Sequence, residues 1–113
     1  QAMECADALL SRPDRPTAIF AANDHMAIAV IMAAHRKGLS VPEDLSVAGV
    51  DDTYMGRSVW PPLTTIAQPF DLMAKTAVEI LCDPTPAPGA ALSTHILPHQ
   101  LIIRESTSRC STG

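Results

Sequence analysis

The chain has 113 residues and a formal net charge of −4, with 8 Lys and Arg against 12 Asp and Glu. This length allows one domain at most, and the scattered cations form no basic stripe that neutralises a run of phosphates, which argues against direct nucleic-acid binding. Cys5, Cys82 and Cys110 are too far apart for a disulfide framework or a zinc site and favour a reducing compartment.

The first residues follow the pattern of a helix and then a strand. Apolar residues recur at helical spacing over residues 2–11 and predict a helix there. The run Ala18–Ala22 is apolar at every position and too short for an ordinary helix, which is typical of a parallel strand covered on both faces. We expect this strand over residues 17–22.

The next segment has well-marked helix ends and an apolar centre. Asn23 or Asp24 suits the N-cap, and Gly38 suits the left-handed position that follows a helix ending at Lys37. Met26–Ala34 is about half the ~20 residues of a membrane span, so no membrane association is expected. A helix that is apolar all round must be covered all round, so we expect the sheet on one side and a second copy of the chain on the other.

A second apolar run, Val47–Val50, predicts a strand over residues 46–50 that ends at Asp51 and Asp52. Helix, strand, helix and strand in this order predict an α/β fold, a Rossmann-like parallel sheet with flanking helices. Such a fold usually has more strands than this chain supplies, and Gln1–Glu4 shows no initiator methionine or signal peptide pattern. We therefore expect a fragment of a longer protein.

The second half of the chain alternates short elements with proline-rich segments. The expected elements are, in chain order, an irregular or single-turn segment over 53–58, a strand over 63–66, a helix over 69–82, a linker over 84–95 and a strand over 96–104. Pro98 marks a break or an edge position in the last strand. The Ser/Thr-rich tail beyond Glu105 is expected to be disordered.

Two polar turns, Asn23-Asp24 and Asp51-Asp52, directly follow the two apolar strands. Open α/β sheets bind ligands beyond the carboxyl ends of their strands, and neighbouring strands lie only about 5 Å apart. The two turns can therefore reach one small molecule together. Taken alone, Asp51-Asp52 is more simply interpreted as a solvated turn that also caps the next helical turn, but the matching position of Asn23-Asp24 favours a binding site.

A magnesium-binding acidic pair at Asp51 and Asp52, as in receiver domains or aspartate-dependent phosphatases, is a competing interpretation. It needs a cation at a neighbouring strand end, whereas Lys75 lies mid-helix and no glycine-rich phosphate cradle occurs. His95 and His99 have the spacing of metal ligands on a helix, but the proline between them indicates extended chain. We expect no metal, no cofactor and no catalysis.

Three of the four aromatic residues, Tyr54, Trp60 and Phe70, follow the acidic turn within 20 residues. Aromatic walls beside carboxylates are a common way to hold sugars or flat heterocycles. Core packing is an equally good interpretation for Phe70 and a better one for Trp60.

Four ordered motifs resemble the lactose-repressor and purine-repressor family of bacterial transcription regulators. They are RPTAIFAANDHMA at 15–27, GLSVPEDLSVAGVDD at 38–52, PPLTTIAQP at 61–69 and LPHQLIIRES at 97–106. The resemblance implies the C-terminal part of an effector-binding domain with the periplasmic-binding-protein-like (type I) fold. In that family a helix-turn-helix head binds operator DNA, and a two-lobed sensor closes on the effector. The head and the first lobe lie outside the resemblance.

The resemblance also implies roles for individual residues. Asp51 matches the carboxylate that contacts the effector, and Asn23 matches an amide on the opposite strand end. Gln68 and Phe70 lie where the crossover toward the other lobe borders the cleft. With half of the cleft walls missing, we expect this fragment alone to bind its effector weakly or not at all.

The family's dimer surface matches the helix that starts near Ile28 and the segment around Val59. The implied domain organisation is a sensor lobe at 1–67, a helix of the other lobe at 68–83, a proline-rich linker at 84–95, a last strand at 96–105 and a disordered tail at 106–113. In this chain the helix at 68–83 lacks its usual sheet. We expect it to be displaced, mobile or packed on a neighbouring molecule.

The sequence thus predicts the effector-sensing part of a cytoplasmic, homodimeric, LacI-type regulator that is not an enzyme and reaches operator DNA only through a helix-turn-helix domain outside this chain. A sugar or small polyol is the favoured effector because neutral hydroxyls suit a carboxylate and an amide, although a purine also fits Asp51. The main alternative is a periplasmic sugar-binding protein of an uptake system, which shares the fold. The stretches VPEDL and PPLTT favour the regulator.

Overall fold

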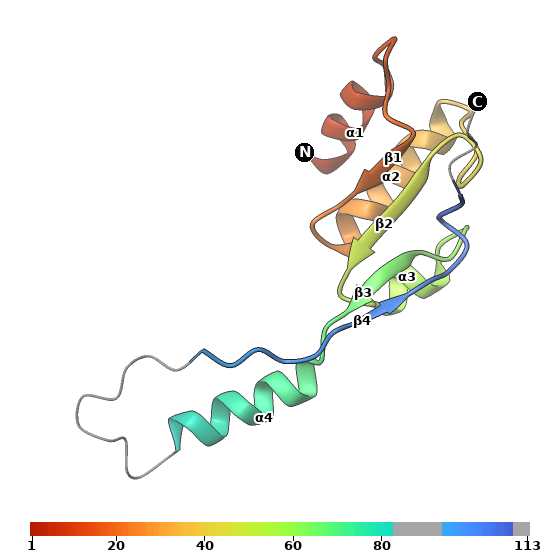
Figure 1. Ribbon diagram of the computed structural model, residues 1–113. Helices are drawn as coiled ribbons and strands as arrows, with labels where there is room; N and C mark the ends of the chain where they lie inside the picture. Colours follow the sequence, from red (N-terminus) through yellow and green to blue (C-terminus); the bar gives the residue numbers. More distant parts are fainter. Residues whose placement is uncertain (83–93, 110–113) are drawn as a thin grey trace.

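One four-stranded sheet organises the chain, for which a computed structural model describes residues 1–82 and 94–109 (Figure 1). The strands are β1 (Ala18–Phe20), β2 (Ser46–Val50), β3 (Thr64–Ala67) and β4 (Gln100–Ile102), and they lie in that order. The first three run parallel, which confirms the predicted α/β class. Strand β4 is antiparallel to β3, because the chain leaves the sheet after β3 and returns directly beside it.

The helices are α1 (Ala2–Leu10), α2 (Asp24–Arg36), α3 (Tyr54–Ser58) and α4 (Phe70–Leu81). The predicted ends of α2 are confirmed. The side chain of Asn23 accepts a hydrogen bond from the backbone N–H of Met26 at 2.9 Å, and Gly38 follows the helix with a φ of 72°. The left-handed conformation at Gly38 is one that glycine adopts without steric cost.

Helix α2 lies at the centre of the hydrophobic core. Its Ile31 packs with Leu45, Val47 and Leu63, all of them fully buried. Within Met26–Ala34, only Met26 and Met32 are exposed, because both the sheet and α1 pack against α2. The chain itself therefore covers most of the apolar surface of α2 that we expected a second copy to cover.

A buried carboxylate connects α2 to β3 and to the start of α3. Asp24, the first residue of α2, is fully buried. Its oxygens accept hydrogen bonds from the backbone N–H of Thr53 at 2.7 Å, from the Thr53 hydroxyl at 3.1 Å and from the Thr65 hydroxyl at 2.5 Å. Gly49 makes room for it, since a Cβ added there would lie 2.6 Å from the Asp24 oxygen. Asp24 thus connects α2 to the segment that begins α3 and to β3.

The segment after β4 is ordered where the sequence predicted disorder. Ser106 is fully buried between the starts of β2 and β3. Its hydroxyl accepts a hydrogen bond from the backbone N–H of Thr64 at 2.8 Å and donates one to the carbonyl of Val47 at 2.6 Å. The predicted disordered tail is therefore wrong for residues 106–109, because this serine satisfies backbone groups of two strands. Residues 110–113 and most of the predicted linker lie outside the described residues.

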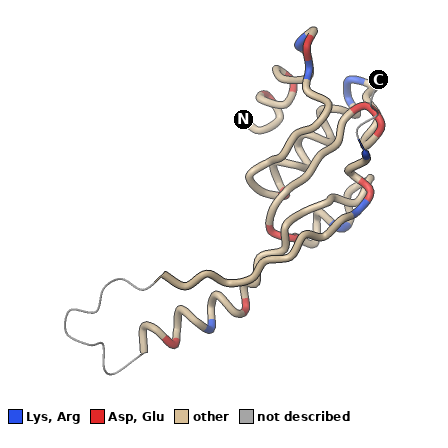
Figure 2. The backbone as a smooth tube through the Cα atoms, viewed as in Figure 1, with Lys and Arg blue, Asp and Glu red and all other residues tan. Residues whose placement is uncertain are grey.

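Helix α4 projects away from the rest of the chain (Figure 1), and none of its residues is buried. The described residues extend over 59 × 27 × 23 Å with a radius of gyration of 18.6 Å, against about 13 Å for a compact domain of this length. Figure 2 shows Asp71, Lys75 and Glu79 along α4 and no charged residue in the described part of the segment that returns from it up to Ile103. No residue of this apolar helix is buried by the described part of the chain, and its assignment to another lobe stays a prediction.

Lys and Arg are spread over the described residues (Figure 2), and only Arg36 and Lys37 are adjacent in sequence. None of the helices within residues 1–82 and 94–109 combines the length and apolar character needed to cross a lipid bilayer.

Removal of the Asp24 carboxylate is expected to destabilise the fold severely. Asp24→Ala leaves the hydroxyls of Thr53 and Thr65 and one backbone N–H without their acceptor in a buried site, which costs about 3 kcal/mol of unfolding free energy. Urea denaturation measures the change. Asp14→Ala, at an exposed aspartate that also accepts side-chain hydrogen bonds, is the control and is expected to leave the free energy of unfolding nearly unchanged. Equal effects of the two substitutions would contradict the structural role of Asp24.

Candidate functional site

Three polar side chains follow the parallel strands at one edge of the sheet. Asn23 comes shortly after β1, Asp51 directly after β2 and Gln68 directly after β3. Since β2 pairs in parallel with both neighbours, these three chain positions meet at the carboxyl edge of the sheet (Figure 1). This is the edge at which the sequence predicted a ligand site.

The backbone at the end of β2 adopts a conformation that is unusual for residues with side chains. Asp51 has a φ of 114° and Asp52 a φ of 53°, the only positive values outside glycine among the described residues. The Asp51 N–H donates to the carbonyl of Ile66 at 2.8 Å and holds the turn against β3. Such strained conformations persist where surrounding contacts fix them and are concentrated at functional sites.

An open hollow of about 410 Å³ lies beside this turn, and it brings three of the four predicted ligand-binding residues together. Asp51, Gln68 and Phe70 all line it, with Asp52 and Arg57 beside them. The Gln68 amide nitrogen donates to the Asp51 carboxylate at 2.7 Å, and the Phe70 ring is half exposed. The hollow therefore offers a carboxylate, an amide and an aromatic face.

The neighbouring carboxylates have different environments. Asp52 is engaged within the chain, with Arg57 at 2.6 Å and Arg104 at 2.5 Å. Burial raises the pKa of Asp52, but hydrogen bonds and charge from Arg104 and Arg57 outweigh it and hold the pKa below its ordinary value of 3.8. Asp51 accepts a side-chain hydrogen bond from Gln68. Of the two carboxylates that the sequence could not distinguish, Asp51 has no arginine partner among the described residues, and its role as a ligand residue stays a prediction.

Asn23 is not among the residues that line this hollow. Its Oδ1 caps α2, and its amide nitrogen donates no hydrogen bond within the described part of the chain. The structure therefore places Asn23 at the predicted edge of the sheet but does not join it to Asp51. Its assignment as a ligand residue stays a prediction.

Sequence reasoning missed the two arginines that hold Asp52. Arg57 lies only five residues further along the chain, in the short helix α3 that follows the turn, and this proximity in sequence is a signal that could have found it. Arg104 lies 52 residues away on the segment after β4, and no local pattern connects it to Asp52. In addition to its carboxylate contact, Arg104 donates to the carbonyl of Leu63 at 2.7 Å.

The two predicted dimer residues lie together on another face. Ile28 and Val59 line an apolar hollow of about 260 Å³ with Tyr54 and Met55. Ile28 itself is almost buried, whereas Tyr54 is 83% exposed and Met55 is 53% exposed. The exposed apolar surface at this position therefore comes mainly from α3, which the sequence treated as an irregular segment or a single turn.

Within residues 1–82 and 94–109, no three His, Cys, Asp or Glu side chains come close enough together to hold a metal ion. The paired arginines at Asp52 also differ from a magnesium site, in which the cation occupies the place that Arg57 and Arg104 take here.

Comparison with known proteins identifies the class to which this fold and site belong. The model of the periplasmic binding protein-like domain family matches residues 1–107. The chain therefore belongs to the periplasmic binding protein-like domain family. The resemblance to the lactose-repressor type of transcriptional regulator within that family, predicted from the four motifs, is confirmed by similar proteins.

The ribose operon repressor of Haemophilus influenzae is 39% identical over 98 residues, which are 87% of this chain and 30% of the repressor. The Lac repressor dimer bound to operator and the anti-inducer ONPF has a TM-score of 0.83 and 36% identity, over 94% of this chain and 37% of that one. A LacI family regulator from Enterococcus faecium with bound ribose has a TM-score of 0.80 and 32% identity, over 95% and 39%. The chain thus spans about a third of the length of these proteins.

The pairing of Asp52 with the two arginines predicts a pH dependence of stability. Because the folded pKa of Asp52 lies below its unfolded value, the pairing stabilises the fold fully above about pH 4 and is lost as the pH falls through the folded pKa. Asp52→Asn is expected to reduce the decline of unfolding free energy between pH 5 and pH 2.5, measured by urea denaturation. Arg104→Gln is expected to reduce it as well, and the double variant to add little. A decline in Asp52→Asn as steep as in the unsubstituted chain would disprove this role.

Proposed function

We propose that this chain forms part of the effector-sensing domain of a LacI-type transcriptional regulator, and that the effector is a sugar or small polyol. The observation that carries the proposal is the convergence of Asp51, Gln68 and Phe70 on one hollow beyond the carboxyl ends of the strands. An ionised carboxylate accepts two hydroxyl donors at once, an amide both donates and accepts, and an aromatic face packs on the C–H groups of a sugar ring. The ribose-bound regulator with a similar fold supports this ligand class.

The geometry suits reversible binding rather than chemical conversion. The Gln68 amide now donates to Asp51, and a hydroxyl ligand takes its place at the carboxylate without any covalent step. A ligand that binds the closed arrangement of the two lobes more tightly shifts an existing equilibrium between open and closed forms. The DNA-binding head responds to that shift. The chain provides one wall of this cleft, and we assign the other wall to the remaining two thirds of such a regulator.

We also propose two macromolecular partners, operator DNA and a second copy of the chain. Operator DNA is bound by a helix-turn-helix head elsewhere in the regulator, so the protein acts in the cytoplasm. A second copy of the chain covers the apolar surface formed by Ile28, Tyr54, Met55 and Val59. The operator-bound Lac repressor dimer supports both partners, and the repressors among the similar proteins favour a regulator over a periplasmic sugar-uptake protein.

Substitution of Asp51 tests the effector site in the full-length regulator. Asp51→Ala is expected to weaken sugar binding about 10- to 100-fold, because hydrogen bonds to a charged acceptor contribute about 1.5–3 kcal/mol. A calorimetric screen with ribose, lactose, other sugars and nucleobases measures effector binding, and fluorescence anisotropy with operator DNA is expected to show unchanged operator affinity. Asp14→Ala is the charge-matched control. Unchanged effector affinity in Asp51→Ala would remove Asp51 from the site.

Substitution on α3 tests the dimer. Met55→Asp places a charge on the proposed interface at a side chain that is 53% exposed, so the single chain remains folded while two copies separate. Sedimentation velocity is expected to show a monomer at concentrations where the unsubstituted protein is a dimer. Leu9→Asp, on the exposed part of α1, is the control and is expected to leave the dimer intact. A Met55→Asp dimer of unchanged affinity would refute this interface.

A further inference from the structure

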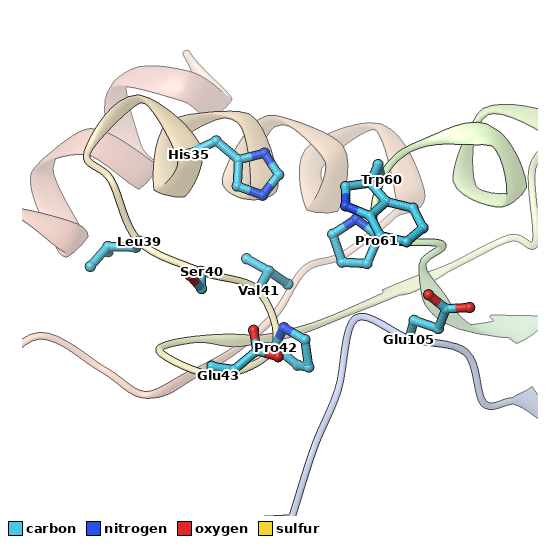
Figure 3. Close-up of a pocket in the computed structure, with 9 residues that line it drawn as sticks. All are labelled: His35, Leu39, Ser40, Val41, Pro42, Glu43, Trp60, Pro61 and Glu105. Atoms are coloured by element: carbon cyan, nitrogen blue, oxygen red, sulfur yellow. The ribbon is translucent and has the colours of Figure 1, made fainter.

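A second hollow, of about 420 Å³, lies at the opposite edge of the sheet from Asp51. It is formed where the loop before β2, the end of α2, the segment before β3 and the segment after β4 meet (Figure 3). Strand β2 separates the two sites, and its five residues span roughly 15 Å. Nothing in the proposed effector site uses this edge.

The charge of this hollow is negative and uncompensated. Glu43 and Glu105 both line it, both are exposed, and neither carboxylate forms a hydrogen bond or an ion pair with any described residue. No Lys or Arg is among the nine residues that line it. In the view of Figure 3 the two carboxylates lie below the hollow, and the rings of His35 and Trp60 lie above it.

The aromatic side of the hollow is formed by the single tryptophan of the chain. Trp60 is 73% exposed, although tryptophan is usually highly buried. The neighbouring Pro61 and Val41 are buried and provide an apolar floor. The electron-rich face of an indole attracts cations, more strongly than the faces of other aromatic side chains.

We propose that this hollow binds a small organic cation, a flexible amine or guanidinium compound whose charge is held by Glu43 and Glu105 and whose carbon chain lies on Trp60. Ammonium and guanidinium groups donate charge-assisted hydrogen bonds to carboxylates, and both pack on indole rings. A metal ion fits this site less well, because only two carboxylates face the hollow and the described residues provide no set of three ligands. The volume is in the range of small-molecule sites.

The experiment is a titration of the 113-residue chain with agmatine, which has a guanidinium at one end and an ammonium at the other. Because Trp60 is the only tryptophan, its fluorescence reports this hollow alone. Agmatine is expected to change the emission saturably, and 1,4-butanediol, a neutral molecule of similar length, is expected to leave it unchanged. The absence of a saturable change with agmatine, or an equal change with the diol, would overturn the proposal.

A matched pair of double variants separates this site from general attraction of cations to an acidic protein. Glu43→Gln with Glu105→Gln is expected to weaken agmatine binding at least tenfold. Glu4→Gln with Glu79→Gln removes the same charge from exposed positions on α1 and α4 and is expected to change the affinity less than twofold. Equal affinities of the two double variants would overturn the proposal, and circular dichroism confirms that both are folded.

Two further variants complete the test. Trp60→Leu, followed by calorimetry, is expected to weaken agmatine binding severalfold, whereas unchanged affinity would exclude the indole from the site. Asp51→Ala is expected to bind agmatine as the unsubstituted chain does. If Asp51→Ala abolished agmatine binding, the cation would occupy the effector hollow instead, and this proposal would fail while the proposed effector site stood.

Discussion

The arrangement of this chain depends on one buried carboxylate. Asp24 starts the central helix, accepts hydrogen bonds from Thr53 and Thr65, and lies against Gly49 of the neighbouring strand. A buried polar group of this kind is stable only while its hydrogen-bond partners stay in place, so the relative positions of α2, β3 and the start of α3 are fixed together. The turn at Asp51 and Asp52 lies between Gly49 and Thr53, and its position follows from the same contacts.

Sequence patterns predicted strand β2 and helix α2 well, because these patterns depend only on residues close together in the chain. The apolar run predicted β2 at Ser46–Val50, and the asparagine and glycine at the ends of α2 marked it closely. What sequence reasoning missed depends on contacts between distant residues. The hydroxyl of the buried Ser106 forms hydrogen bonds with backbone groups of Val47 and Thr64. The Ser/Thr-rich composition of the tail does not reveal these contacts.

The candidate site shows the same division. The positions of Asp51 and Gln68 follow from strand ends, which sequence patterns locate, whereas the difference between Asp51 and Asp52 follows from Arg104, which is 52 residues away. Asp52 is held by two arginines, whereas Asp51 accepts one side-chain hydrogen bond, from Gln68. This difference between adjacent identical side chains depends on tertiary structure, because Arg104 reaches Asp52 from a distant part of the chain.

The exposed apolar side chains of α4 affect how the isolated 113-residue chain behaves in solution. Phe70, Val78 and Leu81 are at least half exposed on a helix that stands away from the body. Exposed surface of this kind adsorbs dyes such as ANS, recruits chaperones and causes precipitation when protein concentrations rise. The exposed face of α4 therefore favours self-association of the chain even while the sheet stays folded.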